Sequence, residues 1–331
     1  MAGATILGCD GPVLMADEAA FFREADPWGF ILFARNVENP EQLRRLTEDL
    51  RAVVGREAPV LVDQEGGRVQ RLRSPHWREW LPALEQVTLA GPGSMRLRAR
   101  IMAAELRAVG IDVVCAPVVD IAGEDTHPFL RNRCYGEELA TVVAAGRAAA
   151  EGFLQGGVLP VMKHMPGHGR GTLDSHLQLP RVSAPKSVLD ANDFVAFRAL
   201  ADLPMAMTAH IVFDAIDPER PATQSPEVIR VIREEIGFAG LLITDDLNMQ
   251  ALAGTLGERT AAAMAAGCDV ALQCNGKPDD MAAVVAAAGR LSPQAEARAA
   301  AALLRRGPPE SVDMGALAAE FESVMAGAAH G

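Results

Sequence analysis

The chain has 331 residues, which allows one large domain or two ordinary ones. Hydrophobic residues make up 49% of the chain and aromatic residues only 5%, a composition that suits a soluble α/β protein with a sizeable core. The net charge of −12 argues against nucleic acid or an anionic membrane as the main binding partner.

Eight short apolar runs recur along most of the chain, and we expect them to form the strands of a parallel sheet. Continuous apolar runs of this length suit strands that are buried on both faces, as strands in parallel sheets usually are. The runs span residues 5–9, 29–33, 59–62, 112–119, 158–162, 205–208, 240–244 and 269–273.

Segments with apolar residues at helical spacing lie between these runs. They span residues 40–54, 95–109, 139–154 and 226–236, and Ser225 is a good N-cap candidate for the last of them. Strands and helices that alternate through eight repeats predict a (β/α)8 barrel, or TIM barrel. Because no linker interrupts the pattern, we expect a single catalytic domain over residues 1–331. Its helical tail would begin at about residue 292 and add a helix over 294–305 on the outside.

Cysteine usage and the N-terminus predict a cytoplasmic protein. The five cysteines form an odd set without a C-x-x-C pair, which indicates reduced, mostly buried thiols and not disulfides or a zinc site. The N-terminus lacks a basic region followed by a long apolar stretch, so no signal peptide is expected. No window approaches the roughly eighteen uncharged apolar residues of a membrane-spanning helix.

Polar residues cluster where the predicted strands end, at the barrel face that carries active sites in this fold. The densest segment, 163–176, places three histidines, a lysine and an aspartate around Pro and Gly breaks. A loop so rich in ionisable groups predicts an active site, although polar strand ends can also be ordinary helix caps. The clustered residues are Asp10, Arg35, Asn36, Asp63, Glu65, Asp120, Lys163, His164, His210, Asp245, Asp246 and Asn275.

Four of these segments carry a specific pattern, at residues 63–71, 132–133, 163–176 and 244–249. It reads Lys-His-x-Pro-Gly-His-Gly, then Asp-Ser-His, and later Thr-Asp-Asp-Leu. With residues 29–36 and 207–213, the segments resemble the bacterial β-N-acetylglucosaminidases of glycoside hydrolase family 3. The resemblance covers about residues 5–275. Residues 131–136 depart from the family's usual Gly-Asp-Arg-Ser-Phe-Gly-like segment but retain Arg133.

The resemblance implies a role for each matching residue. Asp245 would be the nucleophile, and His176 the general acid/base with Asp174 as its partner. The N-acetylglucosamine would be bound by Asp63, Arg71, Arg133, Lys163 and His164. The residue types fit, because retaining hydrolysis needs a carboxylate nucleophile and a group that first gives and later takes a proton. Histidine, with an ordinary pKa of about 6.5, can do both near neutrality.

The expected activity is therefore the removal of terminal N-acetylglucosamine with retention, through a covalent intermediate. The resemblance implies a small-molecule substrate from cell-wall turnover, in which N-acetylglucosamine is joined to an anhydro-muramic residue carrying a peptide. No metal or organic cofactor is implied, and neither nucleic acid nor a membrane is an expected partner. We expect a monomer.

Three alternatives stay open at the level of sequence. A phosphorylase of the same family would use the same site, since a histidine repels incoming phosphate less than a glutamate does. A metal-dependent amidohydrolase needs His-x-His after the first strand, where this chain has Cys9-Asp10-Gly11. A non-catalytic sugar-binding protein would have no reason to keep both Asp245 and the Asp174–His176 pair.

Neighbouring residues are expected to have structural roles. Pro166 and Gly167 exclude a helix that would turn His164 and His168 into a metal pair, so His168 is interpreted as a structural hydrogen-bonding residue. Asp246 is expected to cap or orient its neighbour. Gly169 and Gly171 would let the loop that carries His176 move over bound sugar.

Overall fold

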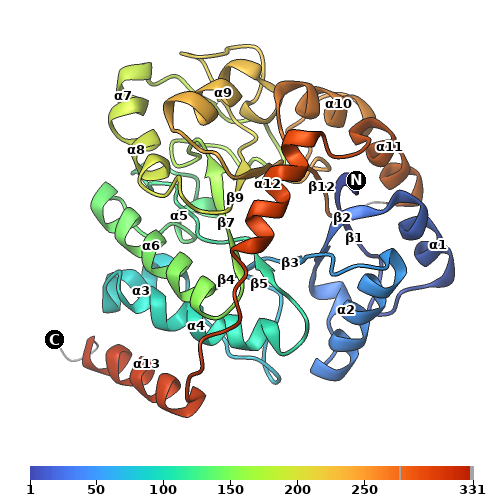
Figure 1. The fold of residues 1–331 in the computed structure, drawn as a ribbon. Helices are drawn as coiled ribbons and strands as arrows, with labels where there is room; N and C mark the ends of the chain where they lie inside the picture. Colours follow the sequence, from blue (N-terminus) through green and yellow to red (C-terminus); the bar gives the residue numbers. More distant parts are fainter. Residues whose placement is uncertain (276, 329–331) are drawn as a thin grey trace.

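The eight predicted apolar runs form the eight strands of a parallel sheet that curves into a barrel surrounded by helices (Figure 1). This computed structural model describes residues 1–275 and 277–328. The strands are β1 (Gly3–Gly8), β2 (Pro27–Leu32), β3 (Val60–Val62), β6 (Val113–Val114), β7 (Leu159–Met165), β9 (Met205–Thr208), β11 (Leu241–Ile243) and β12 (Ala271–Gln273).

The order of the strands confirms the predicted (β/α)8 barrel. They pair in the order β11-β9-β7-β6-β3-β2-β1-β12, and a parallel bridge between Ile243 and Val270 brings the two ends of the sheet together. Two small sheets stand apart: β4 (Gln64–Gly66) pairs with β5 (Val69–Gln70), and β8 (Arg181–Val182) pairs with β10 (Val212–Phe213).

Two predicted strand lengths are wrong. The strand expected over 112–119 is short because Pro117 has no N–H to donate to a ladder. The strand expected to end at Met162 continues to Met165, so Lys163 and His164 lie on β7 and not in a loop. A strand holds a side chain more firmly than a loop does, and this placement gives both residues fixed directions into the barrel mouth.

Alternating side chains divide each strand between two cores. On β1, Ile6 points into the barrel interior, whereas Leu7 packs against the surrounding helices. On β3, Leu61 fills the interior while Val60 and Val62 face the helices. Because both faces of each strand are buried, the strands read as unbroken apolar runs in the sequence.

The predicted helices are present, with local signals at their ends. The α2 helix (Pro40–Val54) begins after Asn39, whose side chain accepts a hydrogen bond of 2.9 Å from the Gln42 N–H. Ser225 caps α9 (Pro226–Arg230) as expected, accepting from the Val228 N–H at 3.2 Å, and a wider helical turn continues over Val231–Glu235. The remaining elements before residue 290 are α1 (Ala16–Ala25), a short turn Ala34–Asn36, α3 (Ala83–Ala90), α4 (Ser94–Arg107), α5 (Pro128–Arg131), α6 (Leu139–Gln155), α7 (Lys186–Ala191), α8 (Asp193–Arg198), a short turn Ala222–Gln224, α10 (Leu256–Ala266) and α11 (Pro278–Ala288).

The first C-terminal helix, α12 (Pro293–Leu304), forms as predicted and lies outside the barrel. It crosses the end of the barrel where the strands begin (Figure 1). Its small residues Ala295, Ala299 and Ala302 are buried against the interior side chains of the strands. Arg298 reinforces the contact through a 2.8 Å ion pair with Asp269, just before β12.

A second C-terminal helix, α13 (Met314–Ala328), was not predicted. It packs against α3 and α4, where the ring of Phe321 meets that of Trp80 at a centroid distance of 5.4 Å. The five cysteines are buried and free, as expected. Across the described part of the chain, no helix combines the length and apolar character required to traverse a lipid bilayer.

Candidate active site

A cavity of about 480 Å³ opens at the ends of the barrel strands and collects the predicted site residues. Asp174 alone among them does not line the cavity; it stands behind His176. The lining side chains from the prediction are Asp63, Arg71, Arg133, Lys163, His164, His176 and Asp245. Residues up to 182 positions apart in the chain, Asp63 and Asp245, thus share one space because their strands end on the same face.

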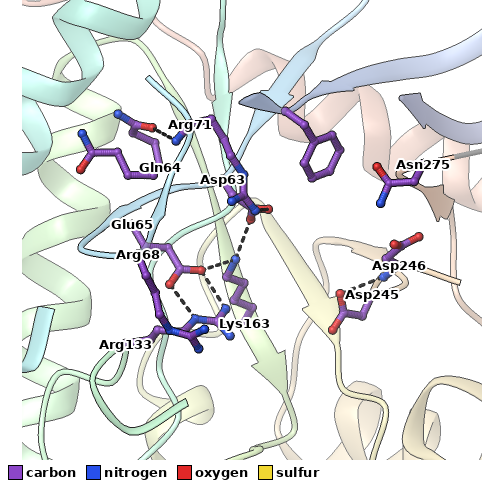
Figure 2. Close-up of polar contacts among 12 residues, drawn as sticks. Asp63, Gln64, Glu65, Arg68, Arg71, Arg133, Lys163, Asp245, Asp246 and Asn275 are labelled. Carbon is purple, nitrogen blue, oxygen red and sulfur yellow. Dashed lines mark hydrogen bonds and ion pairs between the residues drawn. The ribbon is translucent and has the colours of Figure 1, made fainter. Parts of the chain in front are cut away.

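Lys163 is the centre of a charged cluster on one side of the cavity (Figure 2). Its Nζ lies 2.9 Å from Asp63 Oδ1 and 2.6 Å from Glu65 Oε1, and Asp63 Oδ2 accepts a 3.0 Å bond from Arg71. Burial tends to raise the pKa of Asp63, but Lys163 and Arg71 hold it well below its usual range. Burial likewise tends to lower the pKa of Lys163, yet the two carboxylates raise it above its usual range. These groups therefore stay ionised at neutral pH.

Glu65 belongs to this cluster, although it was predicted only as a polar strand-end residue. Arg133 donates two hydrogen bonds of 2.9 Å to the Glu65 carboxylate, one from Nε and one from Nη2. Burial tends to raise the pKa of Glu65, but Arg133 and Lys163 lower it to about 2. The signal in the sequence was its position two residues after Asp63, on the β4–β5 hairpin that turns back over the cavity.

Asp120 orients His164 and was also missed as a site residue. Its Oδ2 lies 2.7 Å from His164 Nδ1, and its carboxylate also accepts from the backbone N–H groups of His164 and His168. Because a carboxylate only accepts hydrogen bonds, His164 Nδ1 carries the proton and Nε2 is directed towards Arg133, 3.4 Å away. A fully buried aspartate thus fixes the ring on the cavity wall.

The predicted Asp174–His176 pair is present on the loop after β7. Asp174 Oδ1 lies 2.9 Å from His176 Nδ1 and also accepts a 3.0 Å bond from the His176 backbone N–H. Burial tends to raise the pKa of Asp174, but these bonds lower it, so the carboxylate is ionised at neutral pH. His176 Nε2 has no bond to another described residue and remains available to a ligand in the cavity.

Asp245 lies across the cavity from the Lys163 cluster, at the end of β11 (Figure 2). Its Oδ1 accepts a 2.8 Å bond from the Asp246 N–H. Burial tends to raise its pKa, but His210, His164 and this bond lower it, so the carboxylate is ionised. The cavity therefore holds an ionised carboxylate and, on a separate loop, an imidazole backed by a second carboxylate.

Asp246 has the orienting geometry that was expected of it. Its Oδ1 accepts 3.1 Å bonds from the backbone N–H groups of Asn248 and Cys274, and its carbonyl oxygen lies 3.0 Å from His210 Nε2. Burial raises its pKa. Arg35 builds the adjacent wall by bonding to the carbonyl oxygens of Cys9 and Cys274 and to the Asn275 side chain, which ties the ends of β1 and β12 together.

His168 was interpreted as a structural hydrogen-bonding residue, and its backbone has this role whereas its ring does not. Its ring is buried and lines the cavity, but neither ring nitrogen bonds to any of the described residues. Its hydrogen bonds are made by the backbone: its N–H donates to Asp120, and its carbonyl oxygen accepts from the Gly171 N–H. Burial and the nearby His164 lower the pKa of His168 to about 4, so the ring is neutral at pH 7. A neutral imidazole with a free donor and a free acceptor suits contact with water or a ligand.

The low pKa of His168 has a consequence for stability. An unfolded chain would protonate this ring below about pH 6.5, whereas the folded protein resists protonation down to about pH 4, so the stabilisation is present above pH 6.5 and fades as the pH falls. Between pH 6.5 and pH 5 we expect a loss of about 2 kcal/mol in the free energy of unfolding. Denaturant titrations at several pH values give the free energy of unfolding of the wild type and of His168→Gln. We expect this free energy to fall less in the variant as the pH is lowered. An identical decline in both proteins would contradict this.

Comparison with known proteins identifies the family of this chain. Residues 17–305 match the glycosyl hydrolase family 3 N-terminal domain. The β-hexosaminidases of Alkalilimnicola ehrlichii and Methylococcus capsulatus are 42% and 38% identical, over 82% and 80% of this chain and 81% and 80% of theirs. NagZ of Neisseria gonorrhoeae, solved with N-trifluoroacetyl-D-glucosamine, superposes with a TM-score of 0.84 at 29% identity, over 99% of this chain and 97% of its own. A family 3 β-N-acetylglucosaminidase from Paenibacillus superposes with a TM-score of 0.86 at 29% identity, over 97% of this chain and 67% of its own. The chain therefore belongs to glycosyl hydrolase family 3, and it is a glycoside hydrolase of the β-hexosaminidase group.

Proposed function

We propose that this enzyme is an exo-acting β-N-acetylglucosaminidase that works by retaining double displacement. One observation carries the proposal: the same cavity is lined by the ionised Asp245 and by His176, which is bonded to Asp174. A covalent glycosidase mechanism needs a carboxylate beneath the anomeric carbon and a proton donor beside the glycosidic oxygen. The N-acetylglucosamine analogue bound by the gonococcal relative supports an amino sugar as the ligand.

In the first step, the Asp245 carboxylate attacks the anomeric carbon as the bond to the leaving oxygen breaks. His176 donates a proton from Nε2 to that oxygen, since Nδ1 is engaged by Asp174. In the second step, Nε2 accepts a proton from water as the water displaces Asp245 from the anomeric carbon. The Asp174 carboxylate stabilises the imidazolium form in both directions, which makes the ring an acid and then a base.

The charged cluster would bind the sugar. Asp63 can accept bonds from sugar hydroxyls, while Arg71 and Lys163 can donate to them, and none of these groups needs to change its charge. Arg133 and His164 complete the same wall. We propose that the substrate is a small peptidoglycan turnover fragment, N-acetylglucosamine joined to an anhydro-muramic peptide, and that the enzyme acts as a cytoplasmic monomer of one catalytic domain.

The decisive experiment is hydrolysis of a chromogenic β-N-acetylglucosaminide, with the anomeric form of the product followed by NMR. We expect free β-N-acetylglucosamine to appear before it mutarotates. Release of the α-anomer first, or no release, would contradict the proposal. The same assay in phosphate buffer separates a hydrolase from a phosphorylase, which would yield the sugar 1-phosphate. Loss of activity on exhaustive chelation would favour the metal-dependent alternative.

A further inference from the structure

The His176 ring touches a second side chain that the proposed mechanism does not use. The ring of Phe129 lies against it in a tilted, edge-to-face arrangement, with centroids 4.3 Å apart and an angle of 64° between the planes. Phe129 is half-buried and lines the cavity next to His176. Aromatic pairs at this separation attract each other beyond their simple burial of area.

Phe129 is itself firmly attached to the barrel. It lies on α5, which begins with Pro128. The His127 side chain caps this helix, because its Nδ1 accepts a 3.2 Å bond from the Phe129 N–H. The next residue, Leu130, is buried in a small core with Val118, Ala122 and Cys134. The guanidinium of Arg68 stacks on the Phe129 ring, with its Cζ 3.7 Å from the centroid, and bonds to the Phe129 carbonyl oxygen.

The same segment also holds the backbone of the catalytic loop. The His127 N–H donates a 3.1 Å bond to the Gly171 carbonyl oxygen, and the Thr126 hydroxyl bonds to the carbonyl oxygen of Gly169. A Cβ atom at position 169 would overlap with the Ile121 carbonyl oxygen, so glycine is needed there for close packing. Beyond the ring, the His176 carbonyl oxygen accepts a 3.1 Å bond from the Gln250 N–H.

The two contacts of the imidazole act on different parts of the molecule. Asp174 lies two residues from His176 on the same loop, so its bond orients the ring within the loop and does not place it relative to the barrel. Phe129 belongs to the segment after β6 and is anchored in its core, so its contact relates the ring to the barrel and hence to Asp245. His176 is otherwise half-exposed on its side chain, at 50% of its accessible area.

We propose that Phe129 is a positioning residue that holds the His176 imidazole at the cavity while Asp174 sets its tautomer. The proposal rests on the glycosidase function proposed above and deepens it at the same site. If it is right, loss of the ring impairs proton donation specifically. Attack by Asp245 should be largely unaffected, because Phe129 lies on the segment after β6 and Asp245 on the loop after β11. The Arg133 guanidinium also lies over the Phe129 ring, with its Cζ 5.3 Å from the centroid, so a loss of sugar binding through Arg133 would lower kcat/KM whatever the leaving group.

The test uses Phe129→Leu, which removes the ring but keeps apolar bulk, and Phe129→Tyr, which restores the ring. For each full-length variant, kcat/KM is measured on an alkyl N-acetylglucosaminide, whose leaving group needs a proton, and on a dinitrophenyl one, which does not. We expect kcat/KM of Phe129→Leu to fall about three- to tenfold on the alkyl substrate and to change less than twofold on the dinitrophenyl substrate. Phe129→Tyr should behave as the wild type on both substrates.

A double-mutant cycle separates positioning from general damage. In a His176→Ala background, Phe129→Leu should cost nothing further on the alkyl substrate, since the ring it positions is gone. Leu177→Ala is the matched control: it removes an apolar side chain, 61% exposed, beside His176, and should leave the ratio of the two substrates unchanged. Equal losses of Phe129→Leu on both substrates, or an undiminished loss in the His176→Ala background, would overturn the proposal. Failure of the wild type to release N-acetylglucosamine would instead overturn the proposed function.

Discussion

Asp245→Asn is expected to lower kcat/KM by about 10⁴-fold or more while the protein remains folded. The carboxylate is ionised in the cavity because His210 and His164 offset the effect of burial, and the proposed first step requires that negative oxygen as the nucleophile. An amide of the same shape cannot form a stable glycosyl ester. Its carbonyl oxygen can still accept the bond from the Asp246 N–H, so the loop after β11 should keep its conformation.

The measurement is kcat/KM on a chromogenic N-acetylglucosaminide, with the melting temperature as a check on folding. Asp246→Asn is the matched neighbour, because its side chain serves backbone N–H groups of Asn248 and Cys274 and an amide oxygen can accept the same bonds. We expect kcat/KM of Asp246→Asn to fall by no more than about tenfold, because this change affects a supporting side chain and leaves the nucleophile in place. Near-normal turnover of Asp245→Asn would remove Asp245 from its assigned role.

His176→Ala is expected to have an effect that depends on the leaving group. General acid catalysis contributes about 10²- to 10⁴-fold, so a substrate with an alkyl or sugar leaving group should lose activity in that range. A dinitrophenyl glycoside needs no proton on departure, and its kcat/KM should fall far less. The geometry favours this outcome because Asp174 holds Nδ1 and leaves Nε2 on the cavity side.

Asp174→Asn provides a graded comparison on the same two substrates. The amide can still bond to His176 Nδ1, but it no longer stabilises the charged ring. We therefore expect kcat/KM on the alkyl substrate to fall in Asp174→Asn, but by less than it falls in His176→Ala. Losses of equal size on both substrates in His176→Ala would show that the ring does not act as the proton donor. The two substrates therefore test the role of His176 independently of that of Asp245.

Local patterns were sufficient for most of the barrel. Each strand was recognisable because both its faces are buried, and each was followed by polar residues because the strand ends line the cavity. The N-caps at Asn39 and Ser225 are local hydrogen bonds between residues three apart, which is why the helix that follows Ser225 could be placed to the residue at its start.

Other features depend on partners far away in the chain. The Ala-rich face of α12 could have packed on the ring of helices or across the barrel end. Its place across the end is decided by interior side chains from the starts of several strands, such as Ala4, Leu159 and Met205, which form one core cluster with it. Glu65 became a site residue through Arg133, 68 positions later, and Asp120 through His164, 44 positions later. The spacing of these residues in the sequence did not predict either pair.

The sequence by itself determined that this chain is an eight-stranded α/β barrel with its ionisable residues gathered at the strand ends, since apolar periodicity and turn chemistry are properties of neighbouring residues. Only the tertiary structure decided which charges neutralise one another, which histidine nitrogens remain free, and that Phe129 meets His176. These outcomes depend on distances between segments that are remote in sequence. Such distances are set by the closure of the barrel and the packing of its loops, which no local pattern encodes.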